Sequence, residues 1–171
     1  MNKYIVFLRG INVGGLKLTQ KDLTHLIESC GFQKIKVFLN SGNIQFQTDL
    51  SKDKIKELLD LILPVPYFLM TYAELFRVFE QRPKISANNC HLYIFIAQSS
   101  FSQTAMREFV QVKPAENEKA LIISDIFFWQ VPIGQTLKTN FGKILSKRQF
   151  REQFTSRNIN TIERIIKYNQ D

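Results

Sequence analysis

The chain has 171 residues, of which 44% are hydrophobic and 22% charged, with 7 Gly and 5 Pro. This composition excludes disordered, collagen-like and low-complexity proteins, and the length is enough for one ordinary domain or for two small ones that share a core. Lys and Arg outnumber Asp and Glu by 23 to 15, so the net charge of +8 favours an acidic or polyanionic partner.

The first half of the chain alternates short β-favouring runs with amphipathic helical segments. Short apolar runs bounded by Gly, Pro and Asn predict strands, whereas Thr19 and Ser51 are N-cap residues followed by apolar side chains at helical spacing. The predicted order is a strand at 4–8, a helix between Thr19 and Gly31, strands at 35–39 and 44–47, a helix between Ser51 and Pro64, and a strand at 67–70. This β-α-β-β-α-β order predicts a ferredoxin-like half over residues 1–71.

The second half repeats much of this order. Thr71 and Glu74 have the spacing of a capping box and predict a linker helix within 72–89. The elements that follow are a strand at 91–97, a helix at 101–110, a hairpin of strands 120–123 and 126–131, a helix at 137–150 and a closing helix at 161–168. We therefore predict an α+β protein of two ferredoxin-like (α/β plait) halves packed together. They are residues 1–71 and a βαββα half at 90–150, followed by a C-terminal motif and closing helix at 151–171.

Neither a metal site nor a targeting segment is indicated. Cys30 and Cys90 have no thiol or histidine neighbour at zinc-ligand spacing, which predicts reduced thiols and no metal or cofactor. The apolar run at 4–8 is too short for a secretory signal or a membrane span. We expect a cytoplasmic protein without a membrane partner.

The first candidate ligand-binding segment is a Gly-rich loop between a predicted strand and a predicted helix. Backbone N–H groups in such a loop can face an anion, with Arg and Lys supplying charge. Its spacing fits neither a P-loop nor the GxGxxG dinucleotide fingerprint. A structural alternative is that the glycines only supply positive φ in a tight connection. The candidate residues are Arg9, Gly10, Asn12, Gly14, Gly15 and Lys17.

The second candidate segment is the hairpin that contains Asn40, Ser41 and Asn43. The first two strands of a β-α-β-β-α-β sheet run parallel, so the Gly-rich loop and this hairpin are predicted to emerge at the same end of the sheet. Ordinary turn chemistry is the alternative explanation, because Asn, Ser and Gly are common in tight hairpins.

The third candidate segment lies before the closing helix and contains Arg157, Asn158 and Asn160. Asn160 and Glu163 have capping-box spacing, so Asn160 is also a candidate N-cap. Residues 131–171 carry 8 basic and 3 acidic side chains, against 9 and 6 in residues 1–70 and 6 and 6 between them. We expect a phosphate-facing surface where the two basic segments meet. In the C-terminal region this surface would combine Arg157 and Asn158 with Lys138, Lys143, Lys147, Arg148 and Arg151. The alternative is a solvated helix face.

Three motifs together resemble the signature of a bacterial family of unknown function. They are LRGINVGG at 8–15, NSGNIQF at 40–46 and TSRNINT at 155–161. Family members resemble this chain over nearly its whole length, and the resemblance implies a pair of ferredoxin-like plaits but no established activity. The chain departs from the pattern at Ile159, where the family usually has a bulky aromatic residue, and near Thr136 to Lys138, where it usually has a Ser-Lys pair.

Three functions are compatible with these residues. The leading hypothesis is a binding module for an anionic ligand, either nucleic acid or a nucleotide. An RNA-recognition-motif surface is disfavoured because Gln45 and Gln47 would occupy the open face of the third strand. The second hypothesis is an enzyme of unassigned chemistry, although no recognisable catalytic constellation surrounds His25 or His91. The third is a protein-interaction module, suggested by 15 phenylalanines.

Overall fold

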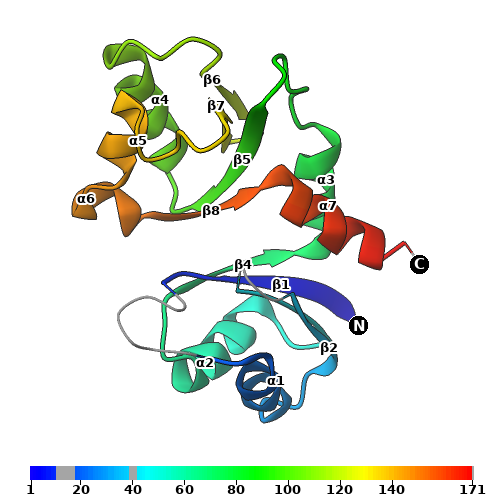
Figure 1. Cartoon of the computed structure of the whole chain (residues 1–171). Coiled ribbons are helices and arrows are strands. Elements are labelled where there is room, and N and C mark those ends of the chain that lie inside the picture. Colours follow the sequence, from blue (N-terminus) through cyan, green and yellow to red (C-terminus); the bar gives the residue numbers. More distant parts are fainter. Residues whose placement is uncertain (11–17, 39–41, 171) are drawn as a thin grey trace. The chain divides into compact units, whose positions relative to one another are not determined.

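The computed structural model describes residues 1–10, 18–38 and 42–170. The chain divides into two compact units, Met1–Phe76 and Arg77–Asp171, each built around one four-stranded antiparallel sheet. The described residues form seven helices in all (Figure 1). The predicted α+β class with two ferredoxin-like halves is confirmed.

The first unit has the complete β-α-β-β-α-β order. Its elements are β1 (Asn2–Leu8), α1 (Gln20–Glu28), β2 (Gln33–Phe38), β3 (Asn43–Thr48), α2 (Lys52–Ile62) and β4 (Tyr67–Thr71). The strands lie in the order β2-β3-β1-β4, with α1 and α2 on one face of the sheet (Figure 1). All six elements agree with the sequence-based prediction to within a few residues at each end.

Side-chain alternation decides which face of this sheet the helices cover. Val6, Ile44 and Phe46 point toward α1 and α2 and are fully buried with Ile27 and Leu59 of those helices. Gln45 lies between Ile44 and Phe46, so it points to the opposite face, as predicted. The helix-facing positions of β1 and β3 therefore form the core of the unit.

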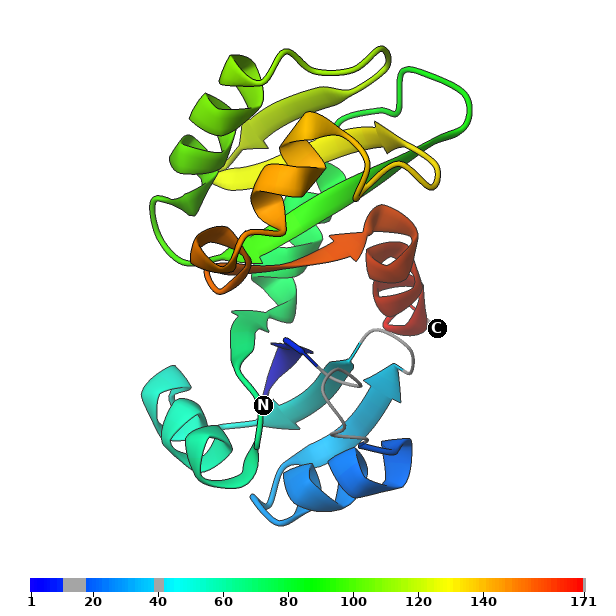
Figure 2. The same cartoon turned by 60° about the vertical axis from the view of Figure 1, so that its left-hand side comes forward.

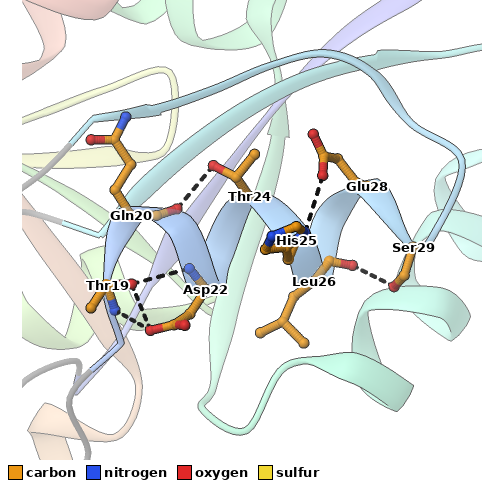
Figure 3. A network of polar contacts seen from close by, with 8 residues as sticks. All are labelled: Thr19, Gln20, Asp22, Thr24, His25, Leu26, Glu28 and Ser29. Atoms are coloured by element: carbon orange, nitrogen blue, oxygen red, sulfur yellow. Dashed lines mark hydrogen bonds and ion pairs between the residues drawn. The ribbon is translucent and has the colours of Figure 1, made fainter.

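A capping box fixes the start of α1, as the sequence predicts. The amide and hydroxyl of Thr19 donate to Asp22 Oδ2 at 2.8 and 2.6 Å, and the amide of Asp22 donates to Thr19 Oγ1 at 3.1 Å (Figure 3). These bonds satisfy backbone donors that the first turn of a helix leaves without an intrahelical partner. They also lower the pKa of the Asp22 carboxyl below its ordinary value.

A second capping box starts α3 (Tyr72–Glu80). The Thr71 amide donates to Glu74 Oε2 at 2.7 Å, and the Glu74 amide donates to Thr71 Oγ1 at 3.1 Å. The boundary between the two units falls inside this helix, between Phe76 and Arg77.

The second unit repeats the topology of the first. Its elements are β5 (Cys90–Ala97), α4 (Phe101–Gln111), β6 (Lys119–Ile123), β7 (Ile126–Pro132), α5 (Asn140–Leu145), α6 (Arg148–Arg151), β8 (Phe154–Asn158) and α7 (Ile159–Tyr168). The strand order β6-β7-β5-β8 corresponds to β2-β3-β1-β4 in the first unit. Figure 2 shows α5 and α6 in orange, followed along the chain by β8.

Three sequence-based expectations for this unit are wrong. The single helix expected at 137–150 is two shorter helices, because Thr139 Oγ1 accepts from the Gly142 amide at 3.0 Å and starts α5, and the first helix ends at Leu145. The segment expected to be a C-terminal motif forms β8, which pairs with β5. The β8 sequence contains a single large apolar residue, Phe154, so it lacks the apolar run or alternation that predicts a strand. The closing helix starts at Ile159 rather than at Thr161.

Aromatic side chains fill the core of the second unit. Phe95, Phe127 and Phe141 pack on the face of the sheet that carries α4 and α5, with ring centroids 5.2 Å apart for Phe95 and Phe127 and 5.7 Å for Phe127 and Phe141. Phe128, the neighbour of Phe127 on β7, points to the other face. On that other face α7 contacts β5 and β8.

The capping box of α1 predicts a measurable effect on the titration of Asp22. Replacing Thr19 by Ala removes the hydroxyl donor, so the pKa of Asp22 is expected to rise toward its ordinary value in a carboxyl-carbon NMR titration. The folded-state pKa of Asp22 is lowered, so its stabilising effect is present above the unfolded-state pKa and is lost as the pH falls. Thr24→Ala is the matched control, because Thr24 Oγ1 donates to the Gln20 carbonyl instead. An Asp22 pKa that is the same in Thr19→Ala as in the wild type would contradict the assignment of this hydrogen bond.

Close packing at Gly142 predicts that even a methyl group is harmful there. A Cβ atom at this position would lie 1.8 Å from the Thr136 carbonyl oxygen, so the backbone must shift. We expect Gly142→Ala to lower the free energy of unfolding by about 1–3 kcal/mol in chemical denaturation. Lys143→Ala, on the exposed side of the same helix, should change it by less than about 0.5 kcal/mol. Equal stability of the two variants would rule out this close contact.

Candidate functional site

The sequence-predicted site residues fall into two sets that belong to different units. Arg9, Gly10 and Asn43 are described in the first unit, and Arg157, Asn158 and Asn160 in the second. The remaining predicted residues lie outside the described part of the chain: Asn12, Gly14, Gly15, Lys17, Asn40 and Ser41.

In the first unit, the end of β1 and the start of β3 meet at one end of the sheet. The Leu8 amide donates to the Gly42 carbonyl at 2.7 Å, and the Arg9 amide donates to the Pro66 carbonyl at 2.8 Å. The end of β1 thus lies beside Gly42, just before β3, while most of the first loop and of the hairpin lies outside the described residues. Gly10 has φ +74° and Gly42 φ +61°, so both adopt the left-handed backbone conformation that favours glycine. Asn43 is fully buried.

In the second unit, Arg157 is a buried residue of the sheet. It lies opposite Ile94 in the β5–β8 pair and is 8% exposed. Its Nη1 donates to Thr155 Oγ1 and to the Ser156 carbonyl, the latter at 2.8 Å. Burial lowers the pKa of the guanidinium to about 10, so Arg157 carries its charge at neutral pH.

Asn158, not Asn160, caps the closing helix. Asn158 Oδ1 accepts from the Asn160 amide at 2.9 Å, so the expected N-cap role of Asn160 is wrong. The physical reason is that β8 runs directly into α7, so the residue at the junction takes the cap. The Asn158 side chain also hydrogen-bonds the Tyr93 hydroxyl across the β5–β8 pair. Asn160 is exposed on the first turn.

Alternation along β8 places neighbouring side chains on opposite faces of the sheet. Ser156 lies opposite Phe95 and Asn158 opposite Tyr93, on the face that carries α5. Arg157 lies on the other face, opposite Ile94. The predicted C-terminal motif is therefore divided between the two faces.

A pocket of about 330 Å³ opens on the α5 face, wholly within the second unit. Strands β5, β7 and β8 form its floor, and the turn at 136–137 together with α5 and α6 forms its wall. Its lining residues are Tyr93, Phe95, Trp129, Thr136, Leu137, Gly142, Leu145, Ser146, Arg151, Phe154 and Ser156.

The inner and outer parts of this pocket differ in chemistry. Phe95 and Trp129 are 1% and 3% exposed, and the ring of Phe154 lies 4.9 Å from that of Phe95. At the opening, Ser146 and Arg151 are exposed and Leu137 is 73% exposed. Burial raises the pKa of Tyr93, so its hydroxyl stays protonated at neutral pH. Tyr93 and Phe154 are half-buried, so they are the rings that present surface to the pocket, and Ser146 and Arg151 supply a hydroxyl and a cation at its opening.

A buried carboxylate holds the Trp129 ring in place. Glu118, 6% exposed, accepts from Trp129 Nε1 at 2.9 Å and from the Ala115 amide at 2.8 Å. The indole N–H is therefore satisfied and its ring plane is fixed at the pocket floor. Sequence reasoning did not identify this pair, because the two residues come from different elements.

The wall of the pocket carries a dense group of cations, which we call the basic helix pair. It comprises five exposed side chains on and around α5 and α6: Lys138, Lys143, Lys147, Arg148 and Arg151. The one acidic residue in this stretch is Glu152, which pairs with Arg148 Nε at 2.9 Å. The basic helix pair therefore has a net positive charge next to the pocket opening.

The first unit has a groove at the corresponding place, between α2 and β4, but its charges are balanced. The groove has a volume of about 630 Å³ and includes Lys52 and Lys56. Lys52 pairs with Glu74 at 3.6 Å, and the Tyr67 hydroxyl donates to Asp60 Oδ1 at 2.7 Å. Desolvation and the neighbouring Asp60 raise the pKa of Tyr67.

The described residues contain neither a metal-binding cluster nor a helix that could span a membrane. Within residues 1–10, 18–38 and 42–170, no group of three His, Cys, Asp or Glu side chains is arranged to hold a metal ion. Over the same ranges, no helix has the length and apolar composition needed to cross a bilayer.

The family follows from a sequence match over most of the chain. The profile of the family described as "protein of unknown function (DUF1697)" matches residues 1–128. The chain belongs to this family. The match includes the positions of the first two sequence motifs and ends before the third, and the predicted membership of a family of unknown function is confirmed. No curated protein matches the chain.

Solved structures support the fold of this DUF1697 member. The conserved bacterial protein SP0830 from Streptococcus pneumoniae is similar with a TM-score of 0.76 and 24% identity, covering 96% of each chain. At this identity, the similarity shows the fold alone. An unknown protein from Galdieria sulphuraria has a TM-score of 0.27 and 11% identity over 92% of this chain and 98% of its own, which carries no structural argument.

The pair of Glu118 and Trp129 predicts that the pocket floor of this DUF1697 member depends on one carboxylate. Glu118→Ala leaves the buried indole N–H without its acceptor, so the free energy of unfolding should fall by about 1–3 kcal/mol in chemical denaturation. The fluorescence of Trp129, the single tryptophan, should change in the folded state. Glu116→Ala, an exposed neighbour, is the control. If Glu118→Ala is as stable as Glu116→Ala, the pair does not hold the floor.

Proposed function

We propose that the chain is a binding module for an anionic ligand that carries an aromatic ring system, with nucleic acid or a nucleotide as the ligand class. The observation that carries this proposal is the aromatic pocket of the second unit, which Arg151 of the basic helix pair lines. The other four members of the basic helix pair lie on the same two helices or close to them in the sequence. Phosphates are attracted by clustered Lys and Arg, and bases stack on aromatic side chains. One site offers both kinds of partner.

Charge distribution supports the second unit as the binding unit. Residues 77–171 carry 14 basic and 8 acidic side chains, whereas residues 1–76 carry 9 and 7. The groove between α2 and β4 occupies the corresponding place in the first unit, yet Asp60 and Glu74 offset its lysines. The shared topology therefore does not account for the positive charge of the basic helix pair beside the pocket of the second unit.

The pocket chemistry favours binding over catalysis. Among the described residues that line it, there is no His, Asp or Glu, so a general acid or base would have to come from a hydroxyl or from the ligand. His91 lies beside the pocket, with Nδ1 3.5 Å from the Tyr93 hydroxyl. Hydroxyls, aromatic rings and one guanidinium are the groups of a recognition site.

The residues singled out in the sequence take different parts in this proposal. Asn158 lies opposite Tyr93 in the β5–β8 pair and caps α7, and Arg157 donates to Thr155 and to the Ser156 carbonyl within β8. Direct contacts of Arg9 and the Gly-rich loop with the ligand remain predictions from the sequence. In this proposal the ligand contacts the residues that line the pocket, including Arg151 at its opening.

The test measures the binding of single-stranded RNA at increasing salt concentration, with the fluorescence of Trp129 as the signal. Log affinity should fall linearly with log salt, with a slope of about −0.7 for each phosphate contact on a single strand. The triple variant Lys147→Ala, Arg148→Ala, Arg151→Ala should bind RNA more weakly, and its slope should be less negative by up to about 2.

The matched control removes the same charge from α2 of the first unit. Lys52→Ala, Lys54→Ala and Lys56→Ala together delete three cations from a single helix. This variant should bind RNA nearly as the wild type does. Salt-independent or undetectable binding by the wild type, or equal losses in both triple variants, would refute the proposal.

A further inference from the structure

We infer that the pocket of the second unit takes a single nucleoside phosphate, with the base inside and the phosphate at the opening. This inference rests on the proposed function and names the ligand more closely. It is carried by the size of the pocket, by the order of its groups from inside to outside, and by Arg151 at its opening with Lys147 one helical turn away.

The size of the pocket fits one small ligand. Its volume of about 330 Å³ lies at the lower end of the range of about 300–1,000 Å³ typical of small-molecule sites. A single heterocycle with its sugar fills such a space, whereas a stacked run of bases needs an extended groove. A longer strand can therefore place one nucleotide here.

The order of groups in the pocket sets the orientation of the ligand. The pocket interior presents the half-buried rings of Tyr93 and Phe154, with the almost fully buried Phe95 and Trp129 behind them. A phosphate placed among these rings would lose its hydration. Arg151 stands at the opening, where a phosphate keeps contact with water. The aromatic base therefore enters first and the phosphate stays outside.

Hydroxyl groups inside the pocket can recognise the edge of a neutral base. Ser156 lies next to Phe95 in the sheet register, and Thr136 lies on the opposite wall. A hydroxyl donates one hydrogen bond and accepts two, so these side chains can serve several bases. No charged side chain other than Arg151 lines the described pocket, which favours an uncharged heterocycle.

Two cations are spaced to hold one phosphate. Arg151 lines the pocket. Lys147 is the N-cap residue of α6, and its carbonyl accepts from the Arg151 amide at 3.0 Å, so the two residues are one helical turn apart. Arg148 pairs with Glu152. A guanidinium and an ammonium one turn apart are suited to bridging the oxygens of a single phosphate.

The test compares the affinity of the full chain for a nucleotide with its affinities for the nucleoside and for the sugar phosphate. The fluorescence of Trp129 reports binding. Adenosine 5′-monophosphate should bind at least about tenfold more tightly than adenosine or ribose 5-phosphate, because each half makes one of the two sets of contacts. It should also displace a 5′-phosphorylated oligoadenylate. Lengthening that oligomer from two to ten nucleotides should change its affinity by less than about tenfold.

Variants separate the base contacts from the phosphate contacts. Arg151→Ala should weaken the binding of adenosine 5′-monophosphate by about tenfold or more and leave the binding of adenosine nearly unchanged. Lys54→Ala on α2 of the first unit, the matched control, should affect the binding of both ligands little. Ser156→Leu, which places an apolar side chain in the pocket, should weaken the binding of both ligands. If Ser156→Leu does not fold, the Arg151→Ala and Lys54→Ala pair still decides.

The outcomes for this inference and for the proposed function are distinct. Oligomers that bind with affinity rising steeply with length, and that adenosine 5′-monophosphate does not displace, would overturn the single-nucleotide inference and leave the proposed function standing. Ribose 5-phosphate as tight as the nucleotide would overturn the inward placement of the base. Failure of every anion to bind would overturn both.

Discussion

The pairing of β8 with β5 is the interaction on which the site of the second unit depends. This register puts Ser156 beside Phe95 and Asn158 beside Tyr93, on the face that α5 and α6 border, and sends Arg157 to the other face. Buried Arg157 donates to Thr155 Oγ1 and to the Ser156 carbonyl, both within β8 itself. A shift of one residue would exchange the two faces and remove Ser156 from the pocket.

The two units show how one topology acquires different chemistry. Both place their second helical segment beside the fourth strand, and both form a hollow there. In the first unit α2 is a continuous helix whose lysines meet Asp60 and Glu74 nearby. In the second, the helical segment is broken after Leu145, aromatic side chains from three strands reach the hollow, and the surrounding charge is positive. Side chains, rather than the fold, thus give the two hollows different charges.

Sequence reasoning captured most of the fold because local signals were strong. Capping boxes at Thr19 and Thr71 and apolar runs such as 91–97 marked elements that the structure confirms. It missed β8, an edge strand that is nearly all polar, and it missed the break between α5 and α6, which depends on caps within one helical pattern. The pocket was not predicted, since its aromatic floor combines Tyr93, Trp129 and Phe154 from strands that pair only in three dimensions.

The most direct test of the central claim is amide chemical-shift mapping of the full chain with adenosine 5′-monophosphate. The account predicts shifts concentrated around Tyr93, Phe95, Ser156 and the segment from Thr136 to Arg151, with the α2 and β4 amides of the first unit unmoved. Shifts centred on α2 and β4, or an unchanged spectrum at saturating nucleotide, would contradict it.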